Sequence, residues 1–221
     1  GMATVYEAEH LHLQSRHAIK VLNPELLVHE DIRDRFLAEG RIQAGLQHPN
    51  IAGVTDIVVE PGIAGLVMEY LDGEAIDTYW HKHGEELGES GLIGLFKQIL
   101  DGVGAAHAKG YVHRDLKPDN ILVVQDVHGA PQIKVLDFGI AKVTEGEGKG
   151  KTRTSATMGT PAYMSPEQIR GAKDVTPASD IWSLGVILYE LVEGVNPFEH
   201  DDPLEQQIAI AQGQYSDLTI D

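Results

Sequence analysis

The spacing of apolar and polar residues predicts a strand-rich first part of the chain and a mainly helical second part. Short runs of apolar and β-branched residues predict strands at Val5–Ala8, Ala18–Leu22, Ile51–Val59, Gly65–Glu69, Ile121–Val124 and Ile133–Leu136. Apolar residues at helical spacing predict helices at Glu30–Gln47, Ala75–His83, Gly91–Lys109, Asp180–Leu191 and Pro203–Gln212. This order of elements is typical of an α+β fold.

Two of these helices have patterns that predict how they pack. The helix at 91–109 carries an apolar stripe that is expected to face the core, formed by Leu92, Leu95, Phe96, Ile99, Leu100 and Val103. The segment Asp180–Leu191 is apolar on nearly all sides, which predicts a helix that is buried all round.

One carboxylate interrupts an apolar helix face. Glu39 lies on the stripe that contains Phe36 and Ile42, and a carboxylate on such a face is costly unless it is paired. Lys20, inside the strand Ala18–Leu22, is its natural partner. Two other interpretations stay open: Lys20 on an edge strand can point to water, and Glu39 can reach solvent from the edge of the stripe.

Composition narrows the classes of function. The 221 residues, 42% of them hydrophobic, can bury a sizeable core. The net charge of −17 disfavours non-specific binding to nucleic acid or anionic lipid. The chain has no cysteine, which excludes disulfides, thiolate metal sites and a cysteine nucleophile. No apolar run approaches the length of a membrane span, so we expect a cytoplasmic domain, attached to a membrane only through segments outside this sequence.

Two polar turns lie next to buried strands and carry the candidate chemistry. The first is His113-Arg114-Asp115-Leu116-Lys117-Pro118-Asp119-Asn120, and the second is Asp137-Phe138-Gly139. With Ser165-Pro166-Glu167 further along, these turns resemble the catalytic loop and the metal-binding loop of protein kinases. The resemblance covers essentially the whole chain. It implies a two-lobed α+β fold, with a β-rich N-lobe at 1–69 and a mainly helical C-lobe at 70–221.

The resemblance also implies roles for individual residues. Asp115 would accept the proton of the attacking hydroxyl, and Lys117 would neutralise the γ-phosphate of ATP. Asn120 and Asp137 would hold Mg²⁺ or Mn²⁺ through their side-chain oxygens. The ion pair of Lys20 with Glu39 would grip the α- and β-phosphates.

Other positions would contact the adenosine part of ATP. The resemblance assigns nucleotide binding to Val5, Ala18, Lys20, Glu69 and Leu71, with Glu69 opening the hinge between the lobes. Only the tail of the family's glycine-rich loop is present at the start of the sequence, and the arginine that pairs with the glutamate at position 167 would come from a later helix. We therefore expect a kinase domain at 1–221 that is truncated at both ends.

Regulation is a further expectation from the resemblance. Arg114 corresponds to an arginine that binds a phosphate on the activation loop, and the candidate phosphate carriers are Thr152 and Thr154. A phosphate there would order the loop through charge-assisted hydrogen bonds. The alternative is that these threonines only keep a surface loop soluble.

The sequence leads to one main hypothesis of function and three alternatives. The lysine at position 117, followed by Pro118-Asp119-Asn120, resembles the serine/threonine class, and Gln168 favours bacterial members. The main hypothesis is therefore ATP-dependent transfer of phosphate to serine or threonine hydroxyls of protein substrates. The alternatives are a pseudokinase or scaffold, an inactive fragment of an active kinase, and a small-molecule kinase of related fold. The segment Gly159–Glu167, which would position a peptide, disfavours the last of these.

Overall fold

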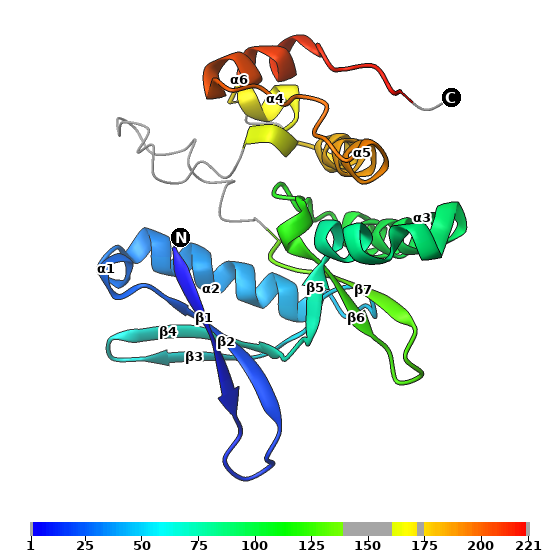
Figure 1. Ribbon diagram of the computed structural model, residues 1–221. Helices are drawn as coiled ribbons and strands as arrows, with labels where there is room; N and C mark the ends of the chain where they lie inside the picture. The colour runs from blue at the N-terminus through cyan, green and yellow to red at the C-terminus, as the bar shows by residue number, and fades with distance from the viewer. Residues whose placement is uncertain (1, 139–160, 172–174, 220–221) are drawn as a thin grey trace.

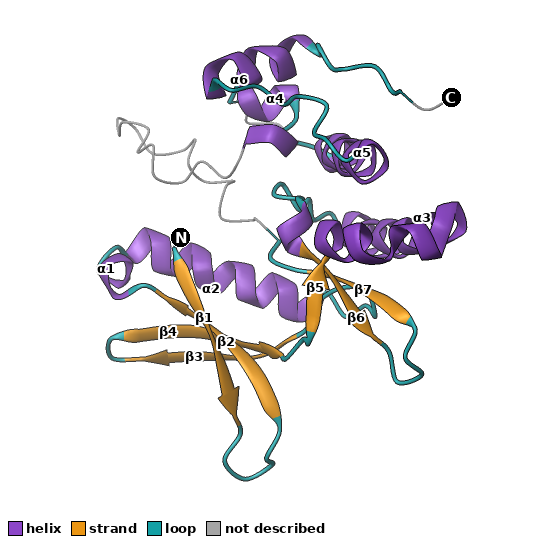
Figure 2. Ribbon diagram, viewed as in Figure 1, coloured by secondary structure: helices purple, strands orange, loops and turns teal. Residues whose placement is uncertain are grey.

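The computed structural model describes residues 2–138, 161–171 and 175–219, and within them the strands form a four-stranded and a three-stranded antiparallel sheet. The strands are β1 (Ala3–Glu9), β2 (Arg16–Leu22), β3 (Val54–Glu60), β4 (Ile63–Glu69), β5 (Gly73–Ala75), β6 (Ile121–Gln125) and β7 (Pro131–Val135). The helices are α1 (Pro24–Leu27), α2 (Glu30–Gly45), α3 (Ile76–Ala108), α4 (Pro166–Ile169), α5 (Pro177–Glu193) and α6 (Pro203–Gln212). The predicted α+β class is confirmed, with the larger sheet and α2 forming one lobe and the longer helices the other (Figures 1 and 2).

The first lobe is a sheet with strand order β1-β2-β4-β3, and α2 packs against it. Its buried cluster joins the sheet to the helix through Leu22, Phe36, Leu37, Val54, Ala64, Leu66 and Met68. Gly40 lets α2 approach β4 closely, because a Cβ at this position would lie 2.2 Å from Leu66 Cδ2. This close packing fixes the face of α2 that carries Glu39, the residue before Gly40.

The connection between α2 and β3 is fastened to the second lobe. Asn50 O accepts a hydrogen bond from Val135 N at 2.8 Å, and Ala52 N donates to Val135 O at 2.9 Å. The side chain of Asn50 donates to Ile133 O at 3.1 Å. Because β7 leads directly into Asp137, these bonds hold the first lobe in register with the second polar turn.

The second lobe is organised around α3, which lies between the three-stranded sheet and α5 (Figure 1). Two separate helices are predicted here, and Gly88, whose φ and ψ values of 60° and −169° are non-helical, does divide the segment Ile76–Ala108 into two helices. Both helices reach closer to Gly88 than the predicted ends at residues 83 and 91. The prediction that Leu100 is in the core is wrong, because this residue is 46% exposed. Ile99 is fully buried, and the next residue is turned by about 100° around the helix axis.

The helix α5 is not buried all round, contrary to the prediction. Ile181 is 55% exposed, whereas Ser179, Asp180 and Ser183 are among its buried residues. The apolar composition therefore did not identify the buried face. That face carries polar side chains because the partners of Asp180 lie on neighbouring elements, at His107, His113 and Arg114.

Candidate active site

The first polar turn connects α3 to β6 and ends in a short 3₁₀ helix at Pro118–Asn120. Within it, Asn120 Nδ2 donates to Asp115 O at 2.8 Å and lies 3.4 Å from Asp115 Oδ2. The buried amide of Asn120 thus fixes the backbone of Asp115 and orients its carboxylate. These two residues, five apart in sequence, lie side by side as the sequence interpretation requires.

His113 joins the two polar turns. Its Nε2 donates to Leu136 O at 2.7 Å, and its Nδ1 accepts a hydrogen bond from Asp115 N at 3.2 Å. Complete burial lowers the pKa of His113, which favours the neutral ring that this donor and acceptor pattern requires. The ring also packs against Phe138, with the ring centroids 4.6 Å apart. Movement of one turn is therefore coupled to the other.

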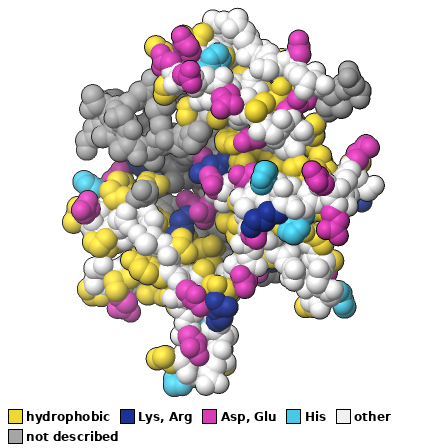
Figure 3. All heavy atoms as spheres, in the orientation of Figure 1, with side chains coloured by type: hydrophobic (Ala, Val, Ile, Leu, Met, Phe, Trp, Pro, Cys, Tyr) yellow, Lys and Arg dark blue, Asp and Glu magenta, His cyan; other side chains and the backbone are white. Residues whose placement is uncertain are grey.

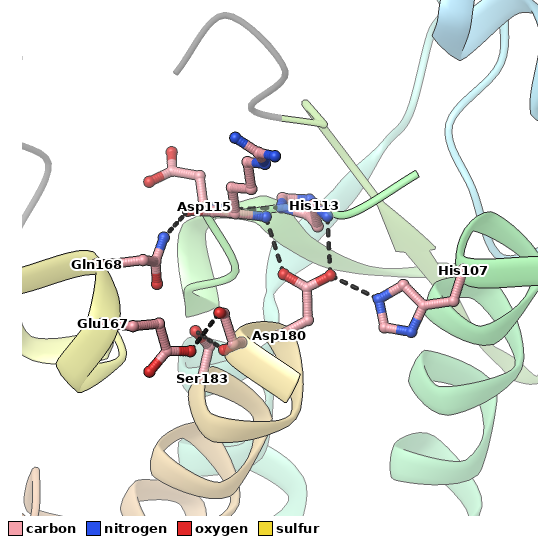
Figure 4. A network of polar contacts seen from close by, with 9 residues as sticks. His107, His113, Asp115, Glu167, Gln168, Asp180 and Ser183 are labelled. Carbon is pink, nitrogen blue, oxygen red and sulfur yellow. Dashed lines mark hydrogen bonds and ion pairs between the residues drawn. The ribbon is translucent and has the colours of Figure 1, made fainter. Parts of the chain in front are cut away.

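Asp180, at the start of α5, supports the first turn from below (Figure 4). Its carboxylate is fully buried and accepts hydrogen bonds from His113 N at 2.8 Å and Arg114 N at 2.8 Å. A third donor is His107 Nε2 of α3 at 2.7 Å. Arg114 has a φ of 68°, a conformation that costs a non-glycine residue about 1–2 kcal/mol. The carboxylate of Asp180 helps to hold this strained residue directly before Asp115.

The sequence interpretation did not assign a role to Asp180 or His107. A usable signal was present, because a carboxylate in the first turn of a helix predicted to be buried must find donors nearby. The spacing of 65 residues or more between Asp180 and its partners hides their identity in a single sequence. The same applies to Gln168, whose Nε2 donates to Arg114 O at 2.8 Å.

Lys20 is the point where the two lobes meet. Its Nζ lies 2.8 Å from Asp137 Oδ1 and 3.6 Å from Glu39 Oε1. Burial works to lower the pKa of Lys20, but the charges of Asp137 and Glu39 offset this effect and leave the pKa raised. Figure 3 shows basic and acidic side chains gathered at this junction of the lobes. The open alternatives for Lys20 and Glu39 are therefore wrong, because their side chains are only 16% and 8% exposed.

Burial of Glu39 predicts a measurable dependence of stability on pH. It raises the pKa of Glu39 from 4.5 to about 7, although Lys20 acts in the opposite direction. Between these values the native state binds more protons than the unfolded chain, so the contribution of Glu39 to stability is fully present below pH 4.5 and is lost as the pH rises through about 7. In wild type we expect this loss to lower the unfolding free energy by about 3 kcal/mol across this range, and we expect the loss to be absent in Glu39→Gln.

Urea denaturation of the nucleotide-free protein at a series of pH values measures this effect as the difference between wild type and Glu39→Gln. The contributions of the other titrating groups to the pH dependence are the same in both proteins and cancel in that difference. Glu60→Gln, at an exposed position at the end of β3, is the matched control and should give no pH-dependent difference. A flat difference for Glu39→Gln as well would show that Glu39 has an ordinary pKa.

The residues predicted to bind metal fit a magnesium ion that also has phosphate ligands. The side chain of Asp137 is 34% exposed, and its φ of 41° turns it out of the strand direction. Because Asn120 uses its Nδ2 on Asp115 O, its amide oxygen is left for another partner. Within the described ranges, no cluster of three or more His, Cys, Asp or Glu side chains could hold a metal ion. One carboxylate and one amide suit Mg²⁺, which keeps several water or phosphate ligands.

The residues predicted to bind adenosine lie on one face of the larger sheet and at the end of its strand β4. Val5 pairs with Lys20 across β1 and β2, and Ala18 is two residues from Lys20, so the three side chains share a face. Val5 is 59% exposed there. Glu69 ends β4, and its N–H is already used, because it donates to Gly53 O at 3.0 Å.

The structure describes three of the remaining predicted residues, Leu71, Lys117 and Arg114. Leu71 follows β4 in the connection to β5 and is half-buried, and Lys117 Nζ lies 3.1 Å from Asp119 Oδ2. Arg114 is half-buried, and burial lowers the pKa of its guanidinium. Thr152 and Thr154 lie outside the described residues.

Comparison with known families decides which family this geometry represents. The protein kinase domain model matches residues 1–219. The chain belongs to the protein kinase family. The predicted resemblance is thereby confirmed, and the kinase fold agrees with the solved structure of Rad53 residues 1–466 in complex with AMP-PNP, which matches with a TM-score of 0.76 and 28% identity over 98% of this chain and 51% of that one.

Curated relatives of this kinase domain are bacterial serine/threonine-protein kinases. Pkn1 of Myxococcus xanthus is 40% identical over 96% of this chain and 30% of its own length. PkaA of Streptomyces coelicolor is 43% identical over 85% of this chain and 34% of its own length. PknA of Mycobacterium tuberculosis is 40% identical over 92% of this chain and 47% of its own length. The chain thus spans between 30% and 47% of the length of these relatives. In the part of the chain that the structure describes, no helix is long and apolar enough to cross a bilayer.

Proposed function

We propose that this kinase domain transfers the γ-phosphate of ATP to serine or threonine hydroxyls of protein substrates in the cytoplasm. The observation that carries the proposal is the position of Lys20, 2.8 Å from Asp137 and 3.6 Å from Glu39. A buried cation beside two carboxylates, next to the turn that holds Asp115, is the arrangement that phosphoryl transfer needs. We take residues 1–69 as the N-lobe and 70–221 as the C-lobe.

In the proposed reaction the chain positions the reactants and moves one proton. Lys20 would bind the α- and β-phosphates once nucleotide separates it from Asp137, and Glu39 would keep it in place. Asp115 would accept the proton of the substrate hydroxyl, and Lys117 would neutralise charge on the γ-phosphate. Asn120 and Asp137 would hold Mg²⁺, which supplies neutralisation of the phosphate oxygens when bound.

The site of the protein substrate is proposed beside the catalytic turn. Asp115 and Lys117 line a small hollow together with Tyr163 and Met164. These last two residues belong to the segment that the sequence assigns to peptide positioning. Such a segment next to the proposed base supports a protein substrate and disfavours a small alcohol.

The test is a transfer assay with radiolabelled ATP, a generic basic protein as acceptor, and Mg²⁺. We expect incorporation that is abolished when EDTA removes the metal and restored by excess Mg²⁺ or Mn²⁺, because phosphate charge would otherwise stay uncompensated. Small alcohols and aminoglycosides should not be labelled. Nucleotide binding without any transfer would support a pseudokinase, and labelling of small alcohols alone would support the small-molecule alternative.

We further propose that phosphate on the segment that contains Thr152 and Thr154 regulates the domain through Arg114. The support is the position of Arg114 directly before Asp115, because a guanidinium is a strong partner for phosphate. Mass spectrometry of the same reaction mixture, in the absence of the acceptor protein, measures the sites of autophosphorylation. Phosphate found only outside residues 152–157 would count against this regulation.

A further inference from the structure

The strained residue Arg114 is held from both sides. Its N–H donates to Asp180 at 2.8 Å, and its carbonyl accepts from Gln168 Nε2, also at 2.8 Å. Its φ of 68° directly precedes Asp115, so a change of this backbone would redirect the Asp115 side chain. Positive φ at a non-glycine residue persists only where surrounding groups enforce it. Gln168 and Asp180 therefore both hold the backbone of Arg114, directly before the proposed base.

Gln168 also has a second, separable function in α4. The side-chain Oε1 of Gln168 accepts a hydrogen bond from Ser165 N at 3.0 Å, and the backbone N–H of Gln168 donates to Ser165 Oγ at 3.4 Å. These two bonds form a capping box that stabilises the start of the helix. One side chain thus caps α4 with its oxygen and reaches the catalytic turn with its nitrogen, as Figure 4 shows for the direction of Gln168.

The helix α4 is itself well anchored, which makes Gln168 an effective clamp. Ser179 Oγ of α5 donates to Glu167, and Ser183 Oγ donates to Tyr163 O at 2.7 Å. Burial works to raise the pKa of Glu167, but the bond from Ser179 and further hydrogen bonds leave it lowered, so its carboxylate is charged and held. Gln168 therefore projects from a segment fixed to α5, the same helix that carries Asp180.

We propose that Gln168 is a positioning residue for the reaction: it holds Arg114 in its strained conformation and thereby aims Asp115 at the acceptor hydroxyl. This inference rests on the proposed function. It links the segment that would bind the substrate to the base that would act on it, because the residues at 161–168 and the turn at 113–115 share this one side-chain bond to Arg114 O.

The test is Gln168→Glu in the 221-residue chain. A glutamate at this position can still accept from Ser165 N and complete the capping box, but an ionised carboxylate cannot donate to Arg114 O. We expect kcat to fall about tenfold, as loss of one hydrogen bond to the catalytic turn implies. The KM for ATP and the thermal midpoint should not change. Gln47→Glu, at an exposed position after α2, adds the same charge and should leave all three values unchanged.

Hydrogen–deuterium exchange of the turn gives a readout that does not need activity. In Gln168→Glu we expect faster exchange at residues 113–115, with no change in α4. An unchanged kcat together with unchanged exchange would overturn the proposal. A joint fall of kcat and thermal midpoint, with faster exchange throughout α4, would also overturn it, because Gln168 would then act in helix capping alone. If wild type transfers no phosphate, the proposed function has failed, and the exchange data alone still decide whether Gln168 clamps the turn.

Discussion

Replacement of Asp115 by asparagine is expected to reduce phosphate transfer to a basic acceptor protein by about 10²–10⁴-fold, the range for loss of a positioned general base. The change keeps the shape of the side chain and removes its ability to take a proton. Asn120 donates to the backbone carbonyl of Asp115 at 2.8 Å, and this bond does not depend on the side chain. The turn, the thermal midpoint and the affinity for ATP should therefore stay as in wild type.

Asp119→Asn is the matched control for this experiment. Its carboxylate belongs to the same turn, and its side chain is 76% exposed in a surface ion pair with Lys117. Exposed pairs contribute little, about 0–1 kcal/mol, so this variant should lose at most a few-fold in rate. If Asp115→Asn retains a rate similar to that of Asp119→Asn, Asp115 is not the base and the proposed mechanism is wrong.

The elements around the proposed site could be predicted because their signals are local. The stripe on α2 carries Glu39 on an apolar face, and the cost of an unpaired carboxylate points to Lys20 as its partner. The structure places these side chains 3.6 Å apart. The two polar turns likewise could be recognised from eight and three consecutive residues. In each case the physical reason for the contact lies within one element and its nearest strand.

Contacts between distant elements could not be predicted in this way. The donors to Asp180 come from α3 and from the turn before β6, and the donor to Arg114 O comes from α4. Nothing in the local pattern of α5 says which of its faces meets those groups, and its apolar composition predicted burial on every side.

Replacement of Asp180 by asparagine is expected to lower the unfolding free energy by about 3 kcal/mol, because the variant leaves buried donors unpaired. The carboxylate accepts from His113 N, Arg114 N and His107 Nε2 with no exposure to water. An asparagine has only one acceptor oxygen. Its NH₂ group would point toward at least one of the N–H donors that the carboxylate now satisfies. For a chain of this size the thermal midpoint should fall by roughly 6–12 °C.

The same variant should also reduce kcat at temperatures where it is fully folded, because Arg114 would lose its support on the N–H side and relax from its positive φ. This joint loss separates Asp180 from Asp115, whose replacement should change the rate alone. Asp101→Asn, at an exposed position of α3, is the matched control and should change neither quantity. Calorimetry and steady-state kinetics on both variants decide the matter. If Asp180→Asn has the same thermal midpoint as Asp101→Asn, the buried carboxylate does not support the catalytic turn.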